Sequence, residues 1–129
     1  MNIPGHLKYT RSHEWAHQAA DHVIAVGITD HAQEVLGDIV FLDLPQVGRE
    51  VAPGETCAVV ESAKAASDIC SPVGGEILAI NEDAAKAPDS VNRNAYAAWL
   101  FKVRPDNPAD FNNLLDATAY RLITLSGDH

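Results

Sequence analysis

Positive charge is scarce in this sequence of 129 residues, which has 9 Lys and Arg against 18 Asp and Glu. The formal charge of -9 repels phosphate backbones and anionic lipid surfaces, so neither nucleic acid nor a membrane is an expected partner. No apolar run approaches the ~20 residues that cross a bilayer, and the amino end lacks the apolar core of a signal peptide. Two cysteines do not indicate a disulfide scaffold. Because a processed organelle protein would have lost Met1, we expect a bacterial cytoplasmic protein.

Sequence motifs of self-contained active sites are also missing, with one formal exception. There is no G-x-S-x-G, no glycine-rich phosphate loop and no C-x-x-C. The exception is H-E-W-A-H, which fits the zinc signature H-E-x-x-H with His13 and His17 as ligands and Glu14 as general base. That signature requires a helix and a third ligand, whereas the preceding residues are β-branched, aromatic and polar. We therefore expect a polar edge strand with Trp15 packed inward, and a zinc hydrolase remains only a remote alternative.

Turn residues rich in glycine and proline separate short apolar runs through the middle of the chain. The predicted strands are 22–28, 38–44, 56–61, 67–71, 75–80 and 99–103. Strands of this length and spacing favour a small sandwich or barrel. Helix signals occur on the flanks, where a polar cap at Thr29 or Asp30 opens a helix over 30–36 and a second helix is predicted over 108–125. With no linker in its length, the chain is predicted to be one domain over 1–129.

Lys64 stands alone among small residues, between the predicted strands 56–61 and 67–71. The simplest interpretation is a solvated surface lysine, which is the usual case. Three features go beyond it: a position at a hairpin tip, alanine and serine neighbours that leave the backbone open to an enzyme, and the turn S-P-V-G-G nearby. An exposed lysine on a rigid tip suits covalent attachment of a cofactor, which a long tether presents to several partners.

The residues around Lys64 distinguish among cofactors. Biotin carriers usually hold the lysine between methionines, and lipoyl domains of 2-oxo acid dehydrogenases usually have an acid directly before it, whereas both neighbours here are alanine. The stretch E-S-A-K-A-A-S-D-I instead resembles the H-protein family of the glycine cleavage system. Segments 7–15, 26–48, 57–69 and 114–120 are similar to that family's segments, in the same order. The family pattern also includes S-H-E-W, but A-Y-A-A-W at 95–99 lacks a proline and one residue of the corresponding segment.

This resemblance implies a lipoyl-carrier fold that is mainly β, a barrel-sandwich hybrid of two small antiparallel sheets with short flanking helices. It also implies a carrier rather than an enzyme, with lipoate in amide linkage on Lys64, attached by a lipoate-attaching enzyme. Lipoyl-Lys64 would accept an aminomethyl group from glycine decarboxylase, deliver it to the aminomethyltransferase and be reoxidised by dihydrolipoamide dehydrogenase. An H-like protein that relays lipoyl groups to other acceptors would share the lysine and is the alternative.

The resemblance further implies a cleft in which the loaded arm rests on a monomeric carrier. The positions that match this cleft are Glu14 and Asp68 as acidic contacts, with Ile28 and Leu36 as apolar walls. A carboxylate suits a protonated amine, and aliphatic side chains suit a hydrocarbon arm. Simple solvation or capping is the competing interpretation of the two acids.

The two cysteines test the register of the predicted hairpin. If Ala63 and Lys64 are the central pair of the turn, cross-strand partners have residue numbers that sum to 127. Cys57 and Cys70 satisfy that sum, so they are predicted to face each other on one side of the hairpin. A reducing cytosol and the geometry of directly paired positions oppose a disulfide, which predicts two free thiols packed as small hydrophobes.

Overall fold

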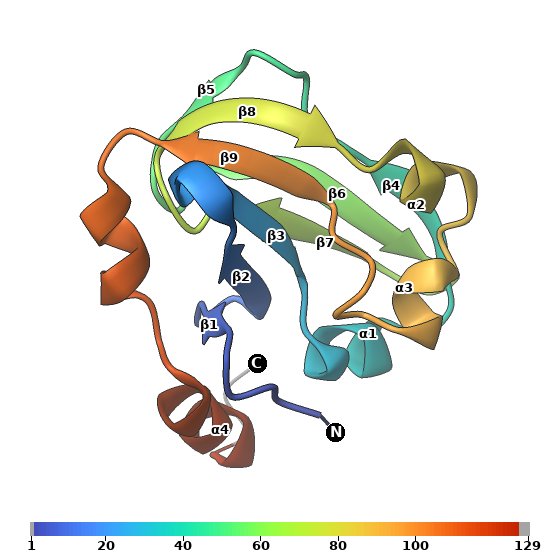
Figure 1. Cartoon of the computed structure of the whole chain (residues 1–129). Coiled ribbons are helices and arrows are strands. Elements are labelled where there is room, and N and C mark those ends of the chain that lie inside the picture. Colours follow the sequence, from blue (N-terminus) through green and yellow to red (C-terminus); the bar gives the residue numbers. More distant parts are fainter. Residues whose placement is uncertain (1, 127–129) are drawn as a thin grey trace.

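The computed structural model describes residues 2–126, which form two antiparallel sheets with short helices at their margins (Figure 1). The larger sheet has the strand order β1-β2-β3-β9-β8-β5, and the smaller sheet has the order β4-β6-β7. The strands of the larger sheet are β1 (Lys8–Tyr9), β2 (Glu14–Gln18), β3 (Ile24–Ile28), β9 (Phe101–Pro105), β8 (Gly75–Ile80) and β5 (Glu50–Val51). Those of the smaller sheet are β4 (Ile39–Asp43), β6 (Thr56–Ser62) and β7 (Ala66–Cys70).

The helices of the described residues are all short. They are η1 (Ala20–His22), α1 (Asp30–Leu36), α2 (Glu82–Lys86), α3 (Ser90–Arg93), η2 (Pro108–Asn113) and α4 (Ala117–Leu125), of which η1 and η2 are 3-10 helices. Within the described part of the chain, no helix has the length and apolar composition needed to cross a membrane.

Apolar side chains from both sheets meet in one core, so the sheets stack as a sandwich and do not close into a barrel. Ile24 and Val26 of the larger sheet are fully buried in this core, as is Val60 of the smaller one. A second cluster lies on the other face of the larger sheet, where Tyr120 of α4 stacks on Tyr9 with ring centroids 4.7 Å apart. The prediction of a mainly β fold with two antiparallel sheets and short flanking helices is confirmed.

Two elements differ from their predictions. The strand that contains Glu14 and Trp15 is not an edge strand, because β1 pairs with it and forms the edge instead. The helix predicted over 108–125 is two helices, η2 and α4, separated at Leu114 to Asp116. Leu115 exchanges backbone hydrogen bonds with Tyr9, at 2.8 and 2.9 Å, and this pairing takes the segment out of helical geometry. The Asp116 side chain then accepts from Ala119 N at 2.8 Å and caps α4.

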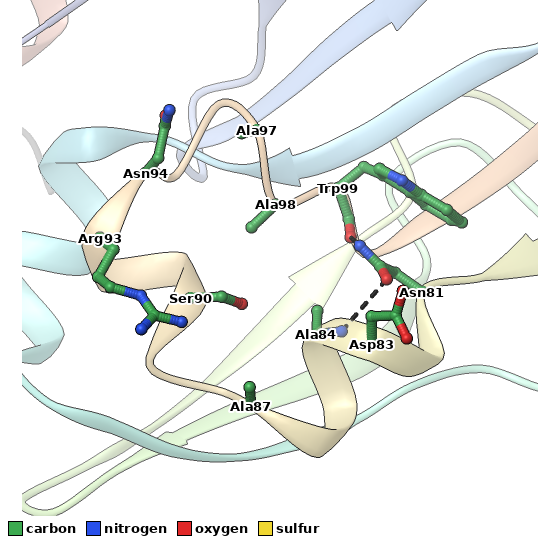
Figure 2. A pocket seen from close by; sticks show the side chains of 10 residues that line it. All are labelled: Asn81, Asp83, Ala84, Ala87, Ser90, Arg93, Asn94, Ala97, Ala98 and Trp99. Carbon is green, nitrogen blue, oxygen red and sulfur yellow. Dashed lines mark hydrogen bonds between the residues drawn. The ribbon is translucent and has the colours of Figure 1, made fainter.

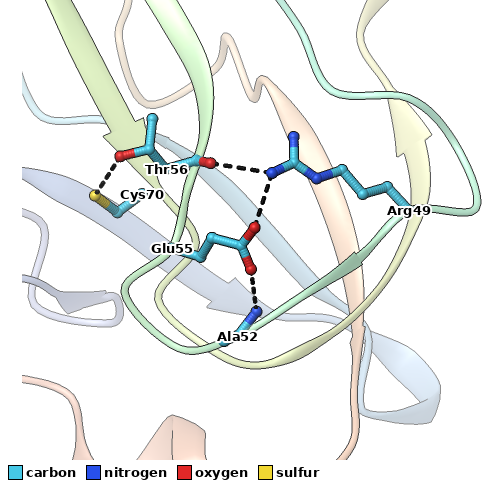
Figure 3. A network of polar contacts seen from close by, with 5 residues as sticks. All are labelled: Arg49, Ala52, Glu55, Thr56 and Cys70. Carbon is cyan, nitrogen blue, oxygen red and sulfur yellow. Dashed lines mark hydrogen bonds and ion pairs between the residues drawn. The ribbon is translucent and has the colours of Figure 1, made fainter.

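The hairpin of β6 and β7 follows the predicted register over most of its length. Ala58 pairs with Ile69 and Glu61 with Ala66, and both pairs sum to the predicted 127. The register shifts between Thr56 and Ala58, where an irregularity at Cys57 leaves Thr56 opposite Cys70. The predicted pairing of Cys57 with Cys70 is therefore wrong, and both cysteines are free. Cys70 Sγ does not face the Cys57 thiol but lies 3.8 Å from Thr56 Oγ1. This contact is close to the ion pair between Arg49 and Glu55, whose N···O distance is 2.9 Å (Figure 3).

The two thiols are expected to differ sharply in reactivity. Cys57 is buried, and this burial raises the pKa of its thiol to about 12, so almost no thiolate forms at neutral pH. Cys70 is only half-buried. An aromatic disulfide reagent should therefore modify Cys70 first and Cys57 only as the fold opens, giving two well-separated phases. Cys70→Ala should remove the fast phase alone; two thiols of equal rate would contradict the burial of Cys57.

Candidate functional site

Lys64 lies at the tip of the hairpin between β6 and β7. Ser62 N donates to Ala65 O at 2.7 Å, which closes the turn around Ala63 and Lys64. The Ser62 hydroxyl oxygen accepts from the backbone N–H of Lys64 at 3.3 Å and of Ala65 at 3.0 Å. These bonds hold the turn backbone while the Lys64 residue stays exposed. The prediction that Ala63 and Lys64 are the central pair of the turn is confirmed.

The turn is also tied to the segment that links α1 to β4. Ala63 N donates to Asp38 O at 3.1 Å. Asn92 of α3 braces this segment, because its Nδ2 donates to Gly37 O at 2.9 Å and its Oδ1 accepts from Ile39 N at 2.9 Å. One amide side chain thus holds the segment against which the Lys64 turn is bonded. Sequence reasoning missed Asn92, since an asparagine in a short polar stretch carries no signal of what it will contact.

Gly37 ends α1 beneath the Lys64 side chain. Its φ of 82° lies in the left-handed region that favours glycine, as expected for the residue that stops a helix. A side chain placed on Gly37 would put its Cβ 3.4 Å from Lys64 Cε. The stem of the lysine therefore lies close over the carboxyl end of α1.

A groove of about 200 Å³ opens between α1 and β7, on the side of the hairpin that faces α1. It is lined by Ser12, His13, His31, Ala32, Val35, Leu36, Ser67 and Ile69. Ser67 comes three residues after Lys64, which in an extended strand is a separation of about 10 Å. The groove therefore combines aliphatic walls from α1 and β7 with polar groups at the β1–β2 loop, close to the lysine.

His13 forms one end of the groove, and its ring is hydrogen-bonded to a residue of α4. His13 has a φ of 71°, and its ring lies 4.7 Å from the ring of His31, centroid to centroid. Its Nδ1 lies 2.7 Å from the Tyr120 hydroxyl, which is also 2.7 Å from Thr29 Oγ1. The carboxyl-terminal helix thus contributes to the groove indirectly, through one buried hydroxyl. Neither His31 nor Tyr120 was predicted as a site residue, because their contacts arise only in the folded chain.

Glu14 is fully buried beneath the loop that carries Ser12. Its Oε1 accepts from Thr10 Oγ1 at 2.5 Å and from Ser12 Oγ at 2.6 Å, and its Oε2 accepts from the Cys70 backbone N–H at 3.3 Å. Burial raises the pKa of this carboxyl above its ordinary value, although the three hydrogen bonds oppose the shift. Glu14 therefore connects β2 of the larger sheet to β7 of the smaller one.

The other three predicted cleft residues lie at different depths. Leu36 lines the groove itself. Asp68 is exposed and lines an adjoining hollow together with Arg11, Ser12, His13 and Ser67. Ile28 is fully buried in the core and pairs with Glu14 across β2 and β3. The structure therefore brings Leu36 and Asp68 to the groove region at its surface, with Glu14 and Ile28 behind it.

The zinc alternative has no structural basis in the described residues. His17 lies in strand β2, and His13 is the residue just before that strand. The two histidines are therefore not one turn apart on a helix, as the zinc signature requires. The Glu14 carboxylate already accepts hydrogen bonds from Thr10, Ser12 and Cys70. Within residues 2–126, no group of three His, Cys, Asp or Glu side chains is placed to hold a metal ion.

A larger hollow of about 540 Å³ lies between α2, α3 and the segment 97–99 (Figure 2). Three of its lining residues, Ala97, Ala98 and Trp99, belong to the stretch 95–99, whose sequence departs from the family pattern. The stretch forms a compact turn in which Asn94 O accepts from the N–H of both Ala97 and Ala98 at 3.2 Å. Asn81 Nδ2 donates to Trp99 O at 2.7 Å and secures its end. The hollow is open, its lining mixes alanine with polar side chains, and Lys64 is not part of that lining.

A two-sheet sandwich that presents one lysine on a braced hairpin turn defines a carrier domain of the lipoyl and biotinyl type. The family model described as glycine cleavage H-protein matches residues 7–126. The chain therefore belongs to the glycine cleavage H-protein family, whose members are non-catalytic lipoyl carriers of the glycine cleavage system. In that system the carrier serves the glycine decarboxylase, aminomethyltransferase and dihydrolipoamide dehydrogenase components.

Individual relatives agree with the family assignment over nearly their whole lengths. The glycine cleavage system H protein of Aromatoleum aromaticum is 60% identical over 120 residues, which cover 93% of this chain and 94% of the relative. That of Thiobacillus denitrificans is 57% identical over 129 residues and covers 100% of both chains. The crystal structure of a glycine cleavage system H protein from Mycobacterium marinum superposes with a TM-score of 0.84 at 40% identity, covering 97% of this chain and 99% of that one. These comparisons do not favour a lipoyl relay or a zinc hydrolase.

Proposed function

We propose that Lys64 Nζ carries lipoate in amide linkage and that residues 1–129 act as one carrier domain that presents it. The observation that supports this most directly is the exposed lysine on a turn braced by Ser62 and Asp38. An enzyme can reach Nζ past alanine neighbours, and the amide removes the lysine charge. The attaching enzyme supplies an activated carboxyl, so Nζ loses a proton and displaces the activating group as the amide forms.

The residues near Lys64 fit a hydrocarbon arm with a polar head. Leu36 and Ile69 give the groove aliphatic walls, and its volume of about 200 Å³ suits part of such an arm. Asp68, exposed at the adjoining hollow, is proposed as the acidic contact of a protonated amine. Glu14 and Ile28 are proposed to act from behind the surface: Glu14 fixes Ser12 at the groove, and Ile28 supports the strand from which Glu14 projects.

Lipoate held on Lys64 would supply a disulfide able to take up an aminomethyl group at glycine decarboxylase, which the aminomethyltransferase would remove, and dihydrolipoamide dehydrogenase would follow by reoxidising the dithiol. The contribution of this chain is to expose Lys64, to shelter the attached group in the groove and to offer a surface to each enzyme. A formal charge of -9 disfavours self-association, which supports a monomeric carrier. The bacterial sources of the relatives support a bacterial cytoplasmic location.

Intact mass spectrometry tests the attachment site. The chain is incubated with a lipoate-attaching enzyme, lipoate and ATP. Its mass should rise by the mass of one lipoyl group in amide linkage. Lys64→Arg should show no increment under the same conditions, because the guanidinium stays protonated and does not acylate. Lys86→Arg, at another exposed position, on α2, is the matched control and should be modified like the unchanged chain. A lipoyl increment on Lys64→Arg would move the attachment to another residue and refute the proposal.

A further inference from the structure

The outer face of the smaller sheet is open to solvent in the described structure, and its side chains follow from the register. Phe41 pairs with Glu61, and Glu61 pairs with Ala66, which gives one row across the three strands. The next row is Asp43, Val59 and Asp68. Because alternate residues share a face, these six side chains lie together, and only Val59 among them is partly buried. The face is therefore a mixture of apolar and acidic side chains that no described element covers.

A bulge in β4 adds another apolar residue at the surface. The register shifts between Ile39 and Phe41, so Val40 is the extra residue. Ile39 and Leu42 are buried, whereas Val40 is 58% exposed and Phe41 is 51% exposed. A regular strand would expose only one of two adjacent residues. The bulge thus presents a valine and a phenylalanine side by side in water, an arrangement that the fold does not need for its own core.

The segments that form this face carry far more negative than positive charge, although Arg11 lies beside Asp68 and Arg49 beside Thr56 at its margins. The segments 30–48 and 56–70, which form α1 and the whole smaller sheet, contain no arginine and no lysine other than Lys64. Their acids are Asp30, Glu34, Asp38, Asp43, Glu61 and Asp68, with Glu55 just before β6 paired to Arg49. Acylation of Lys64 would remove the single positive charge that these two segments carry. A partner that covers the face must therefore bring apolar side chains for Val40 and Phe41 and basic side chains for the acids.

The face adjoins the turn that carries Lys64. Ile39, next to Val40, pairs with Ser62, and Phe41 pairs with Glu61, so both apolar residues lie within one strand spacing of the residues that lead into the turn. Asp38 O accepts from Ala63 N at 3.1 Å. An enzyme that acts on Lys64 Nζ itself must approach the turn backbone closely. An enzyme that acts on the far end of a long arm does not need to do so.

We propose that the outer face of β4, β6 and β7, together with Val40, is the recognition surface for the lipoate-attaching enzyme. This inference rests on the proposed attachment at Lys64. The enzyme's own surface beside its active site carries an apolar centre that receives Val40 and Phe41 and basic side chains that pair with Asp43 and Glu61. This surface lets the enzyme identify the correct lysine, because Lys64 has no bulky or charged neighbour by which it could be recognised locally.

The initial rate of lipoylation, followed by intact mass with lipoate and ATP, tests this surface with matched controls. Val40→Ser and Phe41→Ser are each expected to lower kcat/KM by about 10-fold, as central apolar contacts of an interface do. Val47→Ser is the control for Val40, because both valines are 58% exposed and Val47 lies in the loop before β5. Leu122→Ser is the control for Phe41, because Leu122 is 64% exposed and lies on α4, which packs on the other sheet (Figure 1). Both controls should keep the rate within about twofold.

Charge reversal provides an independent arm. Glu61→Lys should lower kcat/KM and flatten its dependence on ionic strength, because screening then has less attraction to remove. Glu50→Lys on β5 changes the net charge by the same amount away from the face and should alter the rate little.

The outcomes separate the two proposals. If the unchanged chain gains no lipoyl group at Lys64, the proposed function fails regardless of the face. If Lys64 is modified at equal rates in Val40→Ser, Phe41→Ser and their controls, the recognition surface is refuted while the attachment stands. A normal lipoylation rate with slowed transfer by glycine decarboxylase would assign the face to another enzyme and overturn the inference. So would sedimentation showing a dimer that Phe41→Ser dissociates.

Discussion

Replacing Lys64 by arginine is expected to abolish glycine cleavage in a system reconstituted from the purified components. Arginine keeps the length and charge of the side chain, but its guanidinium remains protonated at any working pH and cannot form the lipoyl amide. The residue is exposed at a turn whose hydrogen bonds all come from backbone groups and Ser62. The free energy of unfolding should therefore change by less than about 0.5 kcal/mol.

Activity and stability of Lys64→Arg must be measured on the same preparation, because misfolding of the variant would also abolish activity. Thermal unfolding of Lys64→Arg should superimpose on that of the unchanged chain, and Lys86→Arg should retain full activity. Glycine cleavage by Lys64→Arg above the background without carrier would show that the transferred group does not travel on this residue.

The position of Lys64 was predictable because the turn is specified locally. Strand-forming runs on both sides, small residues between them and Ser62 before the turn are all within a few residues of the lysine. The register followed as far as Ala58 and Ile69. It failed at Cys57, because an irregularity inserts one residue and no sequence signal marks which residue that is. The same limitation hid the bulge at Val40, and with it the exposed apolar pair beside the turn.

The groove residues were harder to predict because they come from distant segments. Leu36 could be anticipated as the last apolar residue of a helix that ends at Gly37. The depth of Glu14 could not, since its burial depends on the Thr10–Ser12 loop and on a backbone N–H from β7. Asn92, which braces the segment under the Lys64 turn, comes from a four-residue helix that was not predicted. Four residues form a helix there through tertiary contacts rather than through intrinsic propensity.

The break in the carboxyl-terminal helix has the same origin. Residues 108–125 have a helical pattern of apolar residues, but Leu115 pairs with Tyr9 of β1, and this long-range pairing prevails over local preference. The consequence reaches the groove, because the separate helix α4 places Tyr120 where its hydroxyl meets His13 and Thr29.

Removing the Glu14 carboxyl is expected to have the largest effect on stability. Glu14→Ala leaves the Cys70 N–H and two hydroxyls without their acceptor inside the protein and opens a cavity between the sheets, which together should cost about 3 kcal/mol. Glu14→Gln should be tolerated much better. Its amide oxygen can accept from Cys70 N, and its NH₂ can donate to the Thr10 and Ser12 hydroxyls, which rotate to accept. Urea denaturation at neutral pH measures both, and equal midpoints for the two variants would contradict this account.

Comparison of the unchanged chain with Glu14→Gln also gives a prediction for the pH dependence of stability. Its sign follows from the direction in which the pKa of Glu14 is shifted. Burial raises the pKa of Glu14 in the folded chain above the ordinary 4.5 that it has when unfolded. Between those two values the folded state holds the proton and the unfolded state releases it, so stability falls as pH rises through the window. Below the window both states are protonated, and above it both are ionised.

Glu14→Gln has no such proton, so the unfolding free energy of the unchanged chain, relative to this variant, should decrease as pH rises from about 4 toward neutrality. Urea midpoints of the two proteins at a series of pH values measure that difference directly. Parallel profiles, or a difference that grows with pH, would show that the hydrogen bonds outweigh burial and that the pKa of Glu14 is not raised.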